Sequence, residues 1–225
     1  MTGISLHGGL PVAWPLAGVS ARQVVTCLTA HWRAVGRPAY AQFDNDTRFQ
    51  GPHQHRDVVG RVMRLCLSLG IRVVFAPVQE HGFQAPIESF NGRWQAKVWT
   101  RFQHESLAAL QAQSARYLAA SRRRAAARID AAPTRRPFPQ EWQLDLQAPP
   151  QGQLIFLRRT SDQGTVHLLG RTFAVAAHWP HRLVRCVVDL DTGVLRCYAL
   201  RRRDPAHQPL LREVPYALPQ RAFKE

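Results

Sequence analysis

The chain has 225 residues, 45% of them apolar, and a formal net charge of +15. That length and composition fit one large or two small folded domains and exclude a disordered chain. Its four cysteines contain no Cys-x-x-Cys pair, which argues against a disulfide framework and a zinc knuckle. A surface this basic favours a polyanionic partner, with nucleic acid ahead of an anionic membrane. Since no run of about 18 apolar residues occurs, we expect a cytoplasmic protein without membrane attachment.

The first 77 residues predict alternating strands and helices. The patterns indicate a strand pair, a helix, a strand, a second helix and a buried strand, over residues 1–20, 21–35, 38–43, 57–69 and 71–77. The strand pair turns at the segment "HGG". Ser20 is the predicted N-cap of the first helix and Gly36 its end, while Gly70 ends the second helix.

The remaining chain changes from helical to strand-rich. A third helix is predicted to open at Ala85–Pro86, because proline is tolerated in a first turn, and to run to about residue 102. A fourth helix covers roughly 106–128, and the prolines of residues 130–150 mark a linker. Five short strands follow from Gln153, and their close spacing predicts a small closed β-barrel.

Positive charge is uneven along the chain. Residues 1–89 hold 8 Lys or Arg against 5 Asp or Glu, residues 90–150 hold 10 against 4, and residues 151–225 hold 12 against 6. Nearly all of these cations are arginine, whose planar fork donates two hydrogen bonds to one phosphate. We therefore expect DNA contacts in the later helices and in the strand-rich segment. The candidates are Arg93, Lys97, Arg101, Arg122, Arg123, Arg124, Arg201, Arg202 and Arg203.

Two carboxylates stand where metal ligands are found in phosphodiester chemistry. Asp44 ends the predicted strand 38–43, and Glu88 lies in the first turn of the third helix. Mg²⁺ prefers hard oxygen ligands, and a pair of such ions stabilises the attacking and leaving oxygens of a displacement. Taken singly, each residue has an ordinary alternative role, Asp44 in a turn and Glu88 at the positive end of the helix dipole.

The segments around both carboxylates resemble one family. "FDNDTRF" (43–49) is similar to the D-N-x-x-x-F segment around the second carboxylate of the DDE transposases, the retroviral-integrase-like class. "GFQAPIESFNGRWQAKVW" (82–99) resembles their third-carboxylate segment. The resemblance implies an α/β fold with an RNase H-like integrase core over residues 1–128. A linker (129–150) and a small C-terminal β-barrel (151–225), similar to that of bacterial insertion-sequence and Mu-type transposases, would follow.

The resemblance also assigns roles to single residues. It makes Asp44 the second and Glu88 the third catalytic ligand, holding Mg²⁺ or Mn²⁺. Asp46 fills a position where the family more often has glycine, and Glu80, in the preceding loop, is the alternative third ligand. Gln95 stands seven residues after Glu88, close to two helical turns, where family members often have a basic residue.

The start of the chain departs from the family. Residues 1–43 contain no Asp and no Glu, so the first strand of the core and its Asp are expected to be absent, as in an N-terminally truncated transposase. With one carboxylate missing, we expect weak metal binding and inactivity of the chain alone, and whether it is an enzyme stays open. The strands next to the missing one would also keep unpaired backbone groups.

Two functions therefore remain open. One is a transposase or integrase-type polynucleotidyl transferase for DNA integration and transposition, in which Mg²⁺-bound carboxylates drive attack on DNA phosphodiesters. The other is a non-catalytic DNA-binding remnant or regulator of a full-length transposase. Both predict double-stranded DNA, as element ends and target, for a partner, a homo-oligomer in the DNA complex, and a bacterial, nucleoid-associated location. A basic RNA-binding protein is a third reading, without an RNP or KH-type segment to support it.

Overall fold

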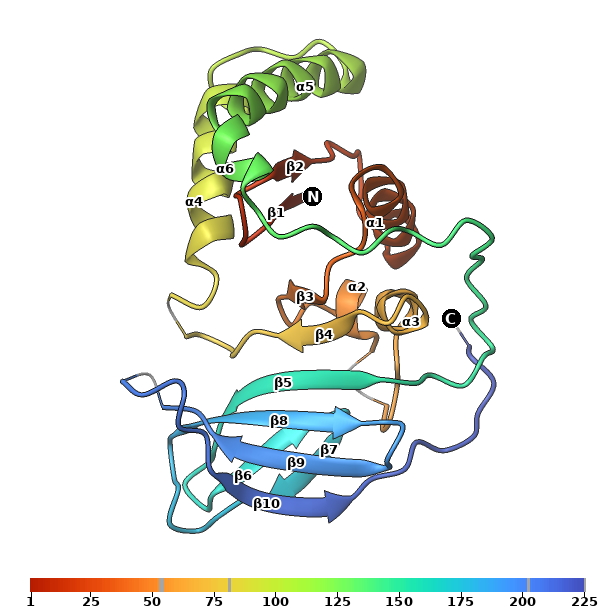
Figure 1. Cartoon of the computed structure of the whole chain (residues 1–225), viewed down its shortest axis with the longest axis vertical. Helices are drawn as coiled ribbons and strands as arrows, with labels where there is room; N and C mark the ends of the chain where they lie inside the picture. Colours follow the sequence, from red (N-terminus) through yellow and green to blue (C-terminus); the bar gives the residue numbers. More distant parts are fainter. Residues whose placement is uncertain (53–54, 81, 202, 225) are drawn as a thin grey trace. The chain divides into compact units, whose positions relative to one another are not determined.

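The computed structural model describes all residues except 53, 54, 81, 202 and 225 (Figure 1). The chain forms two compact units, each from two separate stretches. Unit 1 is Met1–Cys27 with His81–Arg135, and unit 2 is Leu28–Glu80 with Arg136–Glu225; each is described by itself. The two units do not coincide with the three segments expected from the sequence (1–128, 129–150 and 151–225). The boundaries of those segments stay a prediction. In the described part of the chain, no helix is both long and apolar enough to cross a membrane.

Unit 1 packs a β-hairpin against two helices. Its elements are β1 (Thr2–Ile4), β2 (Pro11–Ala13), α4 (Ala85–Trp94), the π-helical turn η1 (Gln95–Trp99), α5 (Leu107–Arg124) and α6 (Ala126–Asp130). β1 pairs antiparallel with β2, as predicted, and Gly8 and Gly9 turn the chain between them at positive φ. Phe90 of α4 and Leu118 of α5 bury their side chains with Ala13 of β2. This apolar contact fixes the helix that carries Glu88.

Helix α1 (Ala21–Val35) has the predicted bounds and crosses from the first stretch of unit 1 into that of unit 2. Its start is a capping box. The N–H of Gln23 donates to the Ser20 hydroxyl, and the N–H of Ser20 donates to the side-chain oxygen of Gln23. Gly36, at φ 81°, ends it in the left-handed conformation that glycine adopts without strain.

Unit 2 is organised around one six-stranded sheet in the order β10-β9-β8-β5-β4-β3 (Figure 1). Its elements are β3 (Tyr40–Phe43), α2 (Thr47–Gln50), α3 (Arg61–Ser68), β4 (Arg72–Phe75), β5 (Gln153–Arg159), β6 (Thr165–Leu168), β7 (Arg171–Ala174), β8 (Leu183–Asp189), β9 (Val194–Ala199) and β10 (Leu210–Pro215). Strands β3, β4 and β5 are parallel, whereas β5, β8, β9 and β10 alternate in direction. A separate hairpin joins β6 to β7.

Strand β5 therefore belongs to two strand sets, the parallel set β3, β4 and β5 and the antiparallel set β5, β8, β9 and β10. It pairs with β4 on one side, placing Phe156 opposite Phe75, and with β8 on the other, placing Phe156 opposite Cys186. The strands after residue 151 thus continue the sheet of β3 and β4, and the barrel expected for them stays a prediction. At the other end of the order, β3 pairs with β4 alone among the described strands, so one of its edges is unpaired.

Three predicted helices differ from those observed. The helix expected from Ala85 to about residue 102 ends at Trp94 and is followed by the π-turn η1. The helix expected over 57–69 begins at Arg61, because Asp57 adopts φ 60° and its buried carboxylate binds Arg171 and the Tyr216 hydroxyl. The helix expected over 106–128 ends at Arg124 and continues after a break as α6. Helix α2 and strand β10 are additions that the sequence patterns did not predict.

Candidate metal centre

Asp44 directly follows β3, at the carboxyl end of the parallel strands of unit 2. Its side chain is exposed, and Oδ1 accepts a hydrogen bond from the backbone N–H of Asp46 at 3.1 Å. In open α/β sheets, ligands bind beyond the carboxyl ends of parallel strands. Asp44 therefore occupies a position suited to a metal ligand, with one carboxylate oxygen oriented by the main chain.

The neighbours of Asp44 hold the strand ends in place. Asn45 donates from Nδ2 to the carbonyl of Ala76 at 2.6 Å, which ties the residue after β3 to the residue after β4. Its Oδ1 accepts from the buried side chain of Gln50 at 2.7 Å. Phe49 stacks on Phe43, with ring centroids 4.9 Å apart. The Asn and Phe of the D-N-x-x-x-F segment thus serve the fold and leave its first carboxylate exposed.

Asp46 has a different role from Asp44. It is the N-cap of α2, and its Oδ1 accepts from the backbone N–H of Arg48 at 2.8 Å. The same carboxylate pairs with the guanidinium of Arg48, whose Nε lies 2.7 Å from Oδ1. This bond raises the pKa of Arg48. Since its oxygens already cap a helix and bind a cation, Asp46 is the weaker candidate for a metal ligand.

Glu88 lies in the first turn of α4 in unit 1, after Pro86, and is exposed. Its carboxylate makes no hydrogen bond or ion pair within the described residues. The residues after it are used by the fold. Phe90 is buried in the core of unit 1, and Asn91 accepts from the hydroxyl of Thr2 at 2.5 Å. The Ser-Phe-Asn segment thus anchors α4 and leaves Glu88 open to solvent.

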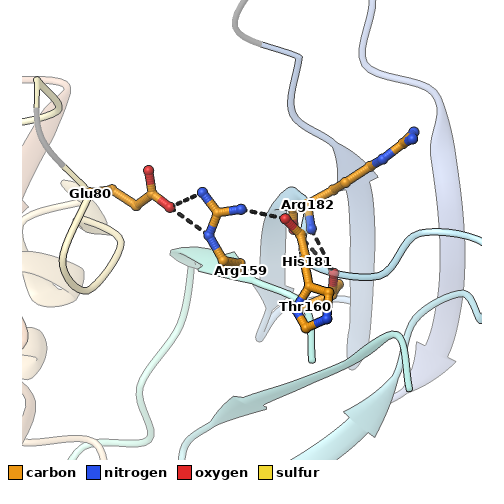
Figure 2. A network of polar contacts seen from close by, with 5 residues as sticks. All are labelled: Glu80, Arg159, Thr160, His181 and Arg182. Carbon is orange, nitrogen blue, oxygen red and sulfur yellow. Dashed lines mark hydrogen bonds and ion pairs between the residues drawn. The ribbon is translucent and has the colours of Figure 1, made fainter. Parts of the chain in front are cut away.

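Glu80, the alternative third ligand, is engaged elsewhere in unit 2. Figure 2 shows its carboxylate bound by the guanidinium of Arg159 on β5, with Nε 2.6 Å from Oε1 and Nη2 also in contact. The opposite end of that guanidinium donates to the carbonyl of His181. The Glu80 side chain is 10% exposed, so it joins the loop after β4 to the C-terminal strands. This ion pair favours Glu88 over Glu80 as a metal ligand.

The donor set fits a hard cation in chemistry but falls short in number. Asp44 and Glu88 are exposed oxygen ligands of the kind that Mg²⁺ or Mn²⁺ takes. Asp44 belongs to unit 2 and Glu88 to unit 1, so each is placed only within its own unit. Among the described side chains, no group of three His, Cys, Asp or Glu could hold a metal ion.

The helix of Glu88 changes its winding where the family often has a basic residue. Gln95, seven residues after Glu88, opens η1, and the N–H of Thr100 donates to its carbonyl at 2.8 Å, an i to i+5 bond. Lys97 lies within this π-turn and is exposed. Sequence periodicity assumed a regular α-helix here and therefore missed the turn. Gly92, just upstream, was the local signal of a weakened helix.

The predicted DNA-contacting cations divide by use. Arg122 donates from Nε and Nη2 to the carbonyl of Pro11, at 3.3 and 3.0 Å, and so ties α5 to β2. Arg123 and Arg124 at the end of α5 are exposed. Four other cations are also exposed, one in the last turn of α4, one after η1 and two after β9: Arg93, Arg101, Arg201 and Arg203. Arg201 lies over the ring of Trp179, 5.8 Å from its centroid. Arg202 lies outside the described residues.

No model of a known protein family matches the chain, and no curated protein is similar to it in sequence. One similar solved structure is a cryo-EM structure of a simian T-cell lymphotropic virus intasome in complex with the PP2A regulatory subunit B56 gamma. The identity is 13%, the TM-score is 0.44, and the match covers 99% of this chain and 72% of that chain. A likeness at this level carries no argument about function.

Proposed function

We propose that this chain is a DNA-binding protein of the DDE transposase and integrase class, with Asp44 and Glu88 as ligands of Mg²⁺ or Mn²⁺. The proposal includes the bacterial insertion-sequence type of transposase, acting in DNA integration and transposition. One observation supports it above the others. In both family-like segments, the flanking residues are used in packing or capping, whereas the two carboxylates are exposed.

When bound, the metal would supply the electrostatic stabilisation of a phosphodiester displacement. The residues of this chain would orient the metal ligands and hold the reacting DNA strand. The Asp46 N–H positions Oδ1 of Asp44, and Asn45 fixes the strand end that carries it. The exposed arginines would bind the phosphates of double-stranded DNA, and the protein would act as a homo-oligomer on it. With two carboxylates, metal binding by the chain alone would be weak and cleavage slow.

Mn²⁺ binding, measured by electron paramagnetic resonance, tests the metal ligands. We expect Asp44→Asn and Glu88→Gln each to weaken binding by about tenfold or more, since removing even outer partners of a metal site costs roughly 10–100-fold. Asp46→Asn is the matched control, because asparagine keeps the N-cap while removing the charge. Equal losses in Asp44→Asn and Asp46→Asn would show that general negative charge, and not Asp44, attracts the ion.

The second candidate function is DNA binding without catalysis. It is favoured by the net charge of +15 and by the lack, among the described side chains, of a group of three His, Cys, Asp or Glu that could hold a metal ion. Nicking of supercoiled DNA by the purified chain in the presence of Mg²⁺ separates the two candidates. Chelator-sensitive nicking that Glu88→Gln abolishes supports the enzyme. Salt-sensitive DNA binding without nicking supports the non-catalytic binder or regulator.

A further inference from the structure

Two buried cysteines face each other in the sheet of unit 2, and the carboxylate chemistry uses neither of them. Cys186 of β8 and Cys197 of β9 are directly opposite in the antiparallel register. Their Sγ atoms lie 3.6 Å apart, in hydrogen-bond contact, and the two residues are 0% and 1% exposed. They are 11 positions apart in the sequence, so the register of the two strands brings them together.

The backbone at these two positions suits a disulfide bond. Directly opposite residues of antiparallel strands have Cα atoms about 4.5 or 5.5 Å apart, and both separations fall within the roughly 4.4–6.8 Å of disulfides. Bond formation requires the sulfurs to approach from 3.6 Å to about 2.05 Å, a shift within reach of side-chain rotation. The other cysteines, Cys27 and Cys66, make no contact with a second thiol within the described residues.

A partly buried guanidinium lies on the same face of the sheet. Phe156 of β5 is opposite Cys186, and Arg158, two residues further along, lies over the Phe156 ring at 5.1 Å from its centroid. Arg158 donates to the carbonyls of Leu157 and His167, and it forms no ion pair in the part of the chain that the structure describes. Burial lowers the pKa of Arg158 to about 10, and the neighbouring Cys186 opposes this shift. A cation without a carboxylate partner favours a nearby thiolate, which is the reactive form of cysteine.

The two sulfurs differ in their readiness to lose a proton. The bond with Cys186 lowers the pKa of Cys197. The bond with Cys197, and then burial, raise the pKa of Cys186, whereas the charge of Arg158 lowers it. Cys197 is therefore the sulfur that reaches the thiolate form first, and the guanidinium favours negative charge on the pair.

We propose that Cys186 and Cys197 are a redox-active pair, which hydrogen peroxide converts to a disulfide and a thiol reductant restores. The Cys197 thiolate attacks one peroxide oxygen: an S–O bond forms, the O–O bond breaks, and the leaving hydroxide takes up a proton as water. The Cys186 sulfur then attacks the resulting sulfenic acid: an S–S bond forms, the S–O bond breaks, and a second water leaves. The two thiols together lose two electrons and two protons, and the peroxide is reduced to water.

The position of the pair in the sheet determines access and consequence. Strand β9 is separated from the sheet edge by β10 alone, and hydrogen peroxide is close to water in size, so local opening of this edge admits the oxidant. The bond would join β8 to β9 and restrict the unfolded chain. We expect the oxidised protein to melt roughly 5 °C higher than the reduced one. Amide exchange at Leu200, whose N–H donates to the carbonyl of Leu183, should slow.

Peptide mass spectrometry tests the pair in the full chain. The variant Cys27→Ala excludes disulfides between chains through the partly exposed Cys27. Trypsin cleaves after Arg185 and Arg196, so the two cysteines fall on separate peptides. After treatment with hydrogen peroxide, we expect the chain to lose the mass of two hydrogen atoms and to give one linked peptide pair, Cys186 with Cys197. Dithiothreitol should restore both free thiols.

Cys66 is the internal control, because it is also 0% exposed but has no second thiol in contact with it in the described part of the chain. It should remain free to alkylation after the treated protein is unfolded. Cys197→Ser should abolish the mass loss. Arg158→Met should slow formation of the linked peptide by about tenfold, and Arg158→Lys, which keeps the charge, should retain most of the rate.

The inference does not depend on the proposed function, because its readout needs neither metal nor DNA. It is overturned if Cys186 and Cys197 stay free, or if they end as separate sulfinic acids without a linked peptide. It is also overturned if Cys66 is oxidised at the same rate, since that would show general unfolding in the oxidant. Equal rates in Arg158→Met and the chain with Arg158 would overturn the role assigned to the guanidinium.

Discussion

At the residue scale, Asn45 fixes the strand end that carries Asp44. Its side chain bridges two elements, because it donates to the carbonyl of Ala76 after β4 and accepts from the buried Gln50 of α2. A carboxylate that binds a metal must be held by neighbours that are themselves fixed. The resemblance pointed to Asp44 and Glu88, whereas the role of Asn45 depends on residues up to 31 positions away and is not visible in the local pattern.

Replacing Asn45 tests this bridging role. Asn45→Ala should lower the free energy of unfolding by about 1–3 kcal/mol, since the Gln50 amide and the Ala76 carbonyl each lose a partner. Asn45→Asp keeps an acceptor for Gln50 but sets a carboxylate oxygen against the Ala76 carbonyl, so it should lower the free energy of unfolding at least as much as Asn45→Ala. Urea unfolding gives the free energies, and Mn²⁺ binding should weaken in the same order. Unchanged stability in Asn45→Ala would contradict a bridging role.

At the element scale, the sequence predicted those helices and strands whose ends are fixed by neighbouring residues in the chain. The hairpin β1–β2 turns at glycines with positive φ, and α1 has a capping box at Ser20 and a glycine stop at Gly36. The start of α3 could not be predicted in this way. Asp57 fits a helix by its spacing, but its contacts with Arg171 and Tyr216, more than 100 residues later, set φ to 60°.

The hairpin between β8 and β9 shows a local signal with a measurable consequence. Asp189 ends β8, and its Oδ1 accepts from the backbone N–H groups of Asp191 and Thr192, at 3.2 and 3.0 Å. Its Oδ2 accepts from the Gln153 side chain of β5 at 2.8 Å. Burial raises the pKa of Asp189, but these hydrogen bonds lower it more, so its pKa lies below the ordinary value. The folded state therefore favours the charged form.

The sign of the pH dependence follows from that direction. Asp189 stabilises the fold fully above the ordinary pKa of about 3.9, and the contribution is lost as the pH falls through the lower pKa of the folded state. Asp189→Asn should destabilise the protein by about 1–3 kcal/mol at neutral pH, with a smaller difference below about pH 3. Urea midpoints across this range measure it, with the exposed Asp162→Asn as control. A neutral-pH difference that persists unchanged in acid would rule out this role for the charge.

At the scale of the molecule, the fold of unit 2 depends on strand pairing between distant parts of the sequence. β3 and β4 lie within residues 40–75, yet their sheet is completed by β5, which begins at residue 153. Sequence patterns identified β5 as a strand but gave no signal for its parallel partner, because hydrophobic alternation is the same for either neighbour. The aromatic rings record the pairing: Phe43 lies beside Phe75, and Phe75 stacks on Phe156 at 5.2 Å.

Phe156 is therefore the residue whose loss should reach both strand sets. It is fully buried, and Phe156→Ala should cost about 3–5 kcal/mol. Amide exchange should then accelerate at two positions together. The N–H of Ala76 donates to the carbonyl of Phe43, and the N–H of Leu200 donates to the carbonyl of Leu183. Leu210→Ala, on the edge strand β10 and 50% exposed, should change stability by no more than about 0.5 kcal/mol. Faster exchange at Leu200 with unchanged protection at Ala76 would mean that the two strand sets unfold separately, because β5 could then open from β8 without disturbing β4.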